Sequence, residues 1–237
     1  MADLLRYRRL AGLCCSLLFP LLLASCNSTV EPEELEPGYA YFPLSPGAYV
    51  DYNALLITFS PDGRSDTSRY LLREQTGSPD TINGDVIYPL YRYSRADSLS
   101  AWQLDSVWTQ RRSTAQAIRT ENNEALVKLV FPVAEGKSWD AHVYSFRESE
   151  MHRMEGIGEP LGLNGLDFAS TLVVAQSELN DPITGQDLRS EVYAQNVGLI
   201  RRESRILEYC TDPECLGLQE IESGRIFEIS VIAYGNE

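Results

Sequence analysis

The chain has 237 residues, with 34 acidic and 20 basic side chains and a formal net charge of −14. Such an acidic surface argues against nucleic acid as a partner and against attraction to anionic lipid headgroups. The length is enough for one good-sized domain or two small ones.

The N-terminus has the parts of a bacterial export signal. Three arginines lie within the first nine residues, and the apolar stretch at 10–23 is too short to span a bilayer. The sequence Leu23-Ala24-Ser25-Cys26 then matches a lipobox, which directs acylation of the cysteine and cleavage just before it. We therefore expect a signal peptide over 1–25 and a membrane anchor of acyl chains on Cys26. The alternative is an ordinary cleaved signal with a chance cysteine.

The residues after the anchor predict a location and a tether. Asn27 follows the cysteine, where aspartate is the familiar signal for retention in the inner membrane. This asparagine favours the outer membrane. Residues 26–38 are acidic, contain proline and have few core-forming side chains, so they predict a lipidated tether that reaches at most about 40 Å. A single domain is expected over 39–237.

The first half of this domain shows hydrophobic residues with a period of two, separated by turn-forming residues. The pattern predicts strands over 49–59, 66–74, 85–95, 100–110, 114–120 and 125–131. Tight turns are expected at Pro61-Asp62-Gly63 and at Asn83-Gly84. Trp102, Leu104 and Trp108 are expected on one face of their strand.

The second half predicts fewer and longer elements, with strands over 138–147, 170–176, 190–208 and 225–234. Gly198 indicates a bulge or a close backbone approach inside its strand, and a short helical turn is the most that we expect around 160–167. The last strand places Phe227, Ile229, Val231 and Ala233 on one face.

About ten strands joined mostly by short loops predict an all-β fold. We expect a single antiparallel, strongly curved sheet resembling a half-barrel or barrel, with a β-sandwich as the alternative.

Cysteine usage predicts one disulfide. Two of the five cysteines leave with the signal peptide and Cys26 is acylated, so Cys210 and Cys215 remain in an oxidising compartment. They flank the turn-prone tetrapeptide Thr-Asp-Pro-Glu. A bond that closes so short a loop should stabilise the domain by about 2 kcal/mol.

We find no catalytic signature, and we expect no catalytic residue, no metal and no cofactor. His142 and His152, with Asp140 or Glu150, would hold a metal only if they faced each other across a hairpin, and two structural histidines are the favoured interpretation. The tryptophans and tyrosines would suit an apolar or sugar-stacking groove on a concave sheet, but filling the core is their favoured role.

Several motifs resemble those of a group of bacterial lipoproteins. They are Tyr41-Phe42-Pro43-Leu44, Phe131-Pro132 and Val197-Gly198-Leu199-Ile200. The chain is similar in these motifs to uncharacterised all-β cell-envelope lipoproteins with no assigned activity. The resemblance implies one domain and an envelope location, and it supplies no catalytic residues.

These observations predict a membrane-anchored envelope lipoprotein with a non-enzymatic role in binding or assembly. Its partner would be another envelope protein or an apolar ligand. One alternative is a carrier that holds a lipid or other apolar ligand in the curved sheet. A second alternative is an enzyme that acts on polysaccharide.

Overall fold

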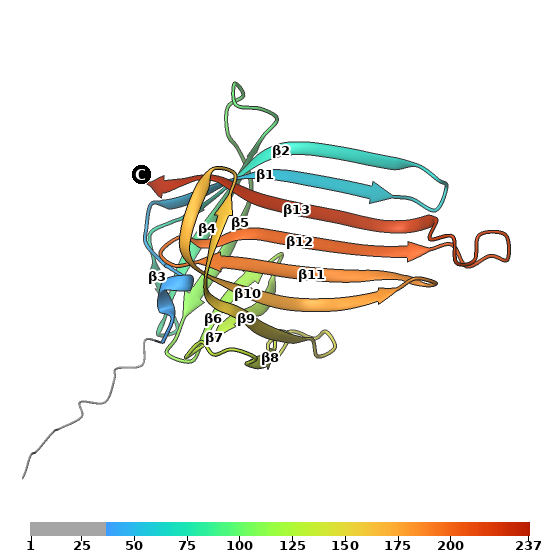
Figure 1. The fold of residues 1–237 in the computed structure, drawn as a ribbon. Helices are drawn as coiled ribbons and strands as arrows, with labels where there is room; N and C mark the ends of the chain where they lie inside the picture. Colours follow the sequence, from blue (N-terminus) through green and yellow to red (C-terminus); the bar gives the residue numbers. More distant parts are fainter. Residues whose placement is uncertain (1–36) are drawn as a thin grey trace, which may run out of the picture. The chain divides into compact units, whose positions relative to one another are not determined.

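A computed structural model describes residues 37–237 of the chain, and the expected signal peptide, Cys26 and the expected tether up to residue 36 lie outside this part. The described residues form one antiparallel sheet that is nearly closed into a barrel (Figure 1). The expected all-β class and the single curved sheet are therefore confirmed. A short 3-10 helix, η1 (Tyr39–Tyr41), precedes the first strand.

Thirteen strands follow η1 in the described residues. In chain order they are β1 (Ala48–Phe59), β2 (Ser65–Thr76), β3 (Asp80–Ile82), β4 (Asp85–Arg95), β5 (Gln103–Arg112), β6 (Gln116–Glu121), β7 (Glu124–Val130), β8 (Ser138–Asp140), β9 (Met151–Leu163), β10 (Leu166–Asp181), β11 (Gly185–Ala194), β12 (Gly198–Tyr209) and β13 (Ile221–Asn236).

The sheet consists of two meanders joined in the middle. Its strand order is β7-β6-β5-β4-β2-β1-β13-β12-β11-β10-β9-β8, and the short β3 pairs with β4. The first and last strands, β1 and β13, lie side by side along their length (Figure 1). The pairing of these strands joins the two halves of the chain.

The two edges of this sheet meet at a seam between β7 and the end of β8. The Val127 backbone N–H donates to the Ala141 carbonyl oxygen at 3.0 Å. The Trp139 indole N–H donates to the Val127 carbonyl oxygen at 2.8 Å. These bonds bring the sheet close to full closure, which removes most of the unpaired edge that an open sheet would expose.

The core lies inside the curve of the sheet. Inward side chains from both meanders pack there, among them Tyr52, Leu72, Leu129, Val174 and Ile229. The turn of η1 contacts β11 and β12 and adds Tyr41 to the same cluster.

The region between β7 and β10 differs from the sequence prediction. Only 138–140 of the predicted strand 138–147 is a strand, and β9 replaces the short helical turn expected around 160–167. The glycines of β9 resemble loop residues, but the register shifts around Gly156 and Gly158 accommodate them as irregularities of a strand. An Asn164-Gly165 turn, with both residues at positive φ, joins β9 to a β10 that begins earlier than predicted.

The predicted strand 190–208 is a hairpin instead of one strand. β11 ends at Ala194 and β12 begins at Gly198, the residue that we expected to form a bulge. Asn196 has φ +64° and Gly198 has φ +95°. Two such left-handed residues reverse the chain, which a continuous strand would not do.

Bulges overturn two predicted faces. In β5, an extra residue at Asp105 reverses the alternation, so Trp108 is buried while Leu104 is 58% exposed on the other face. In β13, the register shift beyond Val231 likewise separates Ala233 from the inward positions. The period-two argument fails at these points because one inserted residue moves every later side chain to the opposite face.

Candidate functional site: a buried ionic network and an outer groove

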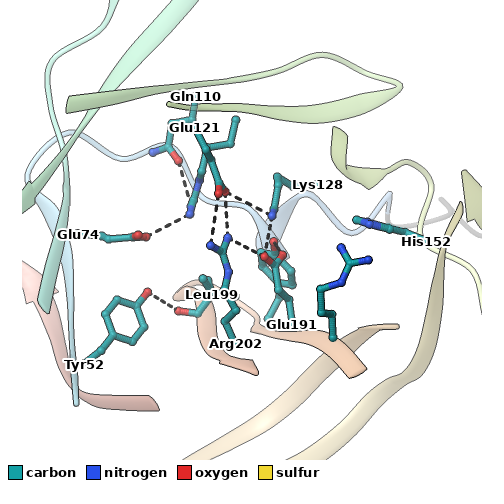
Figure 2. A network of polar contacts seen from close by, with 12 residues as sticks. Tyr52, Glu74, Gln110, Glu121, Lys128, His152, Glu191, Leu199 and Arg202 are labelled. Atoms are coloured by element: carbon teal, nitrogen blue, oxygen red, sulfur yellow. Dashed lines mark hydrogen bonds and ion pairs between the residues drawn. The ribbon is translucent and has the colours of Figure 1, made fainter. Parts of the chain in front are cut away.

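The interior of the barrel contains charged side chains as well as apolar ones. Glu191 on β11 is 1% exposed, and Lys128 Nζ and Arg202 Nη2 each lie 2.6 Å from its Oε1. The Tyr193 hydroxyl donates to the other carboxylate oxygen at 2.5 Å. Glu121 also contacts Arg202, at 2.9 Å, and Lys128, at 3.4 Å (Figure 2). These residues come from β6, β7, β11 and β12, so the ion pairs cross the interior.

A second charged centre lies around Glu74 on β2. Arg119 is 3.1 Å from this carboxylate and Arg92 is 3.2 Å from it. Arg119 also donates to the Gln110 side-chain oxygen at 3.4 Å, and the Tyr52 hydroxyl donates to the Leu199 carbonyl oxygen at 2.8 Å (Figure 2). We call the two centres together the interior network.

The local backbone explains why Lys128 faces inward. The β6–β7 register shifts between Ala117 and Ile118, so Lys128 and its neighbour Leu129 are both buried. A regular strand would place one of these two on the outer face. The bulge therefore places the charged Lys128 side chain among the buried apolar residues of β7.

The interior network holds its carboxylates in the charged form. Burial alone would raise the pKa of Glu121, but Arg202, Lys128 and Arg119 outweigh burial and lower this pKa to about 2. Burial would likewise raise the pKa of Glu191, but Arg202 and Lys128 outweigh burial and lower this pKa well below its ordinary value. Burial and the charge of Glu191 raise the pKa of Tyr193, which stays a neutral hydrogen-bond donor. The arrangement stabilises fixed charges and does not place a titrating acid or base at neutral pH.

Little empty space adjoins the interior network. A cavity of about 40 Å³ lies next to Tyr52, Glu74 and Arg119. This volume has room for a water molecule but not for a lipid chain.

A third polar cluster surrounds His152 on β9. Its Nε2 lies 2.7 Å from Glu150, which also pairs with Arg189 at 2.9 Å. Burial would raise the pKa of Glu150, but hydrogen bonds from His152 and Arg189 lower it to about 2. His142 makes a separate contact, in which its Nδ1 lies 2.8 Å from the Glu148 carbonyl oxygen. Within residues 37–237, no group of three or more His, Cys, Asp or Glu side chains is arranged to hold a metal ion.

The outer face carries a groove of about 850 Å³ over the middle of the sheet. Its floor consists of residues on β1, β2, β12 and β13, among them Leu55, Leu71, Arg201, Glu203 and Glu228. We call it the outer groove.

Two walls border the outer groove. One wall is the loop 96–98 between β4 and β5, and the other is Leu163 at the end of β9. The Asn164 side-chain amide holds the second wall on β13 by donating to the Val231 carbonyl oxygen at 2.8 Å. Arg201 lies within the groove, and its buried Nε has no hydrogen-bond partner. A bound molecule would meet apolar side chains and charged groups together.

The aromatic residues divide between the two faces. Trp108 and Trp139 are buried, as the favoured interpretation expected. Trp102 lies on the outer face, where Arg95 stacks 4.1 Å from its ring centre. Tyr70 is the aromatic residue that lines the outer groove, so the groove is not the aromatic surface considered from the sequence.

The structure joins Cys210 and Cys215 by a disulfide with a Cα–Cα distance of 5.9 Å. The bond closes a turn in the loop between β12 and β13. Leu216 and Leu218 in the same loop are exposed to solvent. Cys26, the predicted site of lipid attachment, lies outside the described residues.

Sequence reasoning missed both the interior network and the outer groove. A signal exists for one member of the network, because Lys128 interrupts the apolar stretch of the predicted strand 125–131. Such a charge in a buried run indicates an ion pair, but not its partner. The groove leaves no local signal because residues of five strands and one loop form it.

Comparison with known proteins shows no family for this chain. No family model matches the chain, and no curated protein matches it in sequence. A crystal structure from Bacteroides fragilis, of a protein described as exported with a YmcC-like fold, is similar at a TM-score of 0.44 and 12% identity. The match covers 82% of this chain and 98% of that one. Within residues 37–237, no helix is long and apolar enough to cross a membrane.

Proposed function

We propose that this protein is a lipid-anchored protein of the bacterial outer membrane that binds a partner in the outer groove, without catalysis. The groove is the observation that carries the binding role, because at about 850 Å³ it lies in the size range of ligand sites. The lipobox ending at Cys26 supports the anchor.

The interior supports binding outside the barrel and not transport inside it. An apolar carrier needs an apolar cavity, whereas here apolar side chains fill the interior and Glu191, Lys128 and Arg202 place charges among them. Opening this space to a lipid would expose each buried charge to hydrocarbon, which is strongly unfavourable. We therefore place the partner on the outer face.

The anchor is tested by labelling cells with palmitate. We expect wild-type protein to take up the label and Cys26→Ser to remain unlabelled, because the thiol is the attachment point. Equal labelling of the two chains, or no labelling of either, would contradict the anchor.

The groove is tested by site-specific photocrosslinking in intact cells. A photoreactive residue in place of Leu71, on the groove floor, should yield an adduct with a partner. The matched control is Leu104, an exposed leucine on the same face but outside the groove, which should yield none. Equal adducts from the two positions, or none from Leu71, would contradict binding in the groove.

Two carboxylates in the groove allow the catalytic alternative to be tested in the same system. Glu203 and Glu228 are register partners on β12 and β13, and paired carboxylates are the groups that hydrolyse glycosides. Each lies within 4 Å of an arginine, Arg201 or Arg205. For a binding protein, Glu203→Gln should leave polysaccharide in the culture unchanged. Altered polysaccharide with intact crosslinking from Leu71 would favour an enzyme.

A further inference from the structure

The loop between β8 and β9, residues 141–150, presents large hydrophobic side chains to solvent. Val143 is 58% exposed, Tyr144 is 51% exposed, and Phe146 is fully exposed at 112%. We call these three residues the apolar tip. A soluble surface carries single exposed hydrophobic residues routinely, but three within four positions of one loop indicate a contact surface.

The base of the loop is held by hydrogen bonds. The Asp140 carboxylate accepts the backbone N–H groups of His142, at 2.9 Å, and of Glu150, at 3.0 Å. The His142 ring contacts the Glu148 carbonyl oxygen, and Arg147 forms an ion pair with Glu124. The loop therefore presents the apolar tip from a defined base.

The apolar tip lies near the place where the tether enters the domain. The Pro37 carbonyl oxygen accepts the Val133 N–H at 3.0 Å, and the Tyr39 hydroxyl donates to the Thr114 carbonyl oxygen at 3.2 Å. Gln116, two residues after Thr114, donates to the Tyr144 hydroxyl. The entry of the tether thus contacts the turn between β5 and β6, and the loop contacts the first residue of β6 just after this turn.

The tether limits how far this surface can be from the membrane. Pro37 lies eleven positions after Cys26, and a chain of this length reaches at most about 40 Å. If Cys26 holds the acyl chains, the surface around Pro37 is confined to the neighbourhood of the bilayer.

We propose that Val143, Tyr144 and Phe146 insert into the interfacial layer of the bilayer that holds the acyl chains. This inference rests on the proposed lipid anchor and adds a second membrane contact to it. Tyrosine suits the interface because its ring is apolar and its hydroxyl stays hydrated, and Phe146 and Val143 supply apolar area. The contact is apolar and not electrostatic, since a chain of net charge −14 gains nothing from anionic headgroups.

The chain offers a matched control at the other end of the sheet. The backbone N–H of Asn196 donates to Ala40, which places the Gly198 end of β12 beside the tether entry. β12 has 12 residues and therefore spans about 40 Å to its other end. Leu218, in the loop beyond that end, is 65% exposed. It resembles the apolar tip in exposure but not in position.

The test uses the acylated full chain in phosphatidylcholine vesicles whose acyl chains carry bromine, a short-range quencher of tryptophan fluorescence. Phe146→Trp and Leu218→Trp are compared with wild type, whose three native tryptophans supply the background. We expect bromine to cause a loss of Phe146→Trp emission beyond the background and to leave Leu218→Trp at the background. Both sites are exposed, so neither change disturbs the core.

Flotation of the same samples separates the possible failures. Wild-type chain that does not float with the vesicles would contradict the lipid anchor itself. Chain that floats while Phe146→Trp stays unquenched would overturn the membrane contact and assign the apolar tip to a protein partner. Equal quenching of both variants would also overturn the inference, because contact would then not depend on the position of the loop.

Discussion

Each buried charge in the interior depends on an oppositely charged partner, as the contacts among Glu191, Lys128 and Arg202 show. Removing a charged group from water costs several kcal/mol, and a buried opposite charge offsets that cost only when the geometry is good. The contacts of 2.6 Å at Glu191 meet this condition. Loss of any one partner leaves a buried charge without compensation.

Arg202→Met tests this dependence. The change leaves Glu121 and Glu191 without their shared guanidinium, and we expect the free energy of unfolding to fall by about 3–5 kcal/mol. Urea denaturation followed by fluorescence measures the loss. Arg64→Met is the control, because Arg64 pairs with Asp62 in the open and its loss should cost at most about 1 kcal/mol. Similar losses in both variants would show that the interior pairs contribute little.

The lowered carboxylate pKa values also predict a dependence on pH. Glu121 and Glu150 have pKa values of about 2 in the folded chain against an ordinary value of 4.5. Their stabilisation is therefore complete above about pH 4.5 and is lost as the pH falls toward 2. Urea midpoints measured over this range should decline, and Glu150→Gln should make the decline shallower. A midpoint that does not change with pH in wild type would contradict the assignment.

At the scale of elements, turns and bulges determine which side chains meet. The hairpins at Asn164-Gly165 and Asn196 reverse the chain through left-handed residues, and register shifts in β5, β7 and β13 change which face a side chain occupies. Glycine is required for a different reason where β11 begins and near the start of β13, because neighbouring backbones pack closely there. Gly185 and Gly224 both face the backbone around Leu207 of β12.

Gly224→Ala tests the close approach of these strands. The residue has φ +134°, and an added Cβ would collide with the Ile206 carbonyl oxygen. We expect a loss of at least about 1–3 kcal/mol in the free energy of unfolding, measured by urea denaturation. Gly162→Ala in β9 is the matched control, since its Cβ would meet its nearest atom at 3.4 Å, and the change should stay within about 1 kcal/mol. An equal effect at both positions would contradict the backbone explanation.

At the scale of the whole domain, the seam of the sheet is held by fewer hydrogen bonds than the other strand pairs. Neighbouring strands elsewhere are joined by ladders of at least three residue pairs, whereas the seam between β7 and the end of β8 has the bonds of Val127 with Ala141 and Trp139. Regions with fewer hydrogen bonds open at lower free energy than the rest of a domain.

Native-state hydrogen exchange tests whether the seam opens first. The Val127 amide should exchange faster than the amides that pair β1 with β13, because opening the seam breaks few bonds and leaves both meanders intact. Trp139→Phe removes one seam bond and should increase the exchange of Val127 further. Equal protection of Val127 and the central ladder would indicate a barrel that opens only by global unfolding.

The sequence alone was sufficient for the all-β class and for the strands of the first meander. Alternation along 49–59 and 85–95 and the turn at Asn83-Gly84 are local signals, and β1 and β4 follow them closely. The second meander was harder to predict from the sequence, because Gly156, Gly158 and Pro160 in β9 are residue types typical of a loop. Only pairing with β10 makes that segment a strand.

What the sequence by itself determined is the alternation of apolar and polar residues, and with it an antiparallel sheet, because that period is set by neighbours two positions apart. The tertiary structure alone decided that Glu74 meets Arg119, that Lys128 meets Glu191, and that five strands and one loop enclose the outer groove. The physical reason is separation along the chain. These partners are 45 and 63 residues apart, and no local pattern records which strands curvature will bring together.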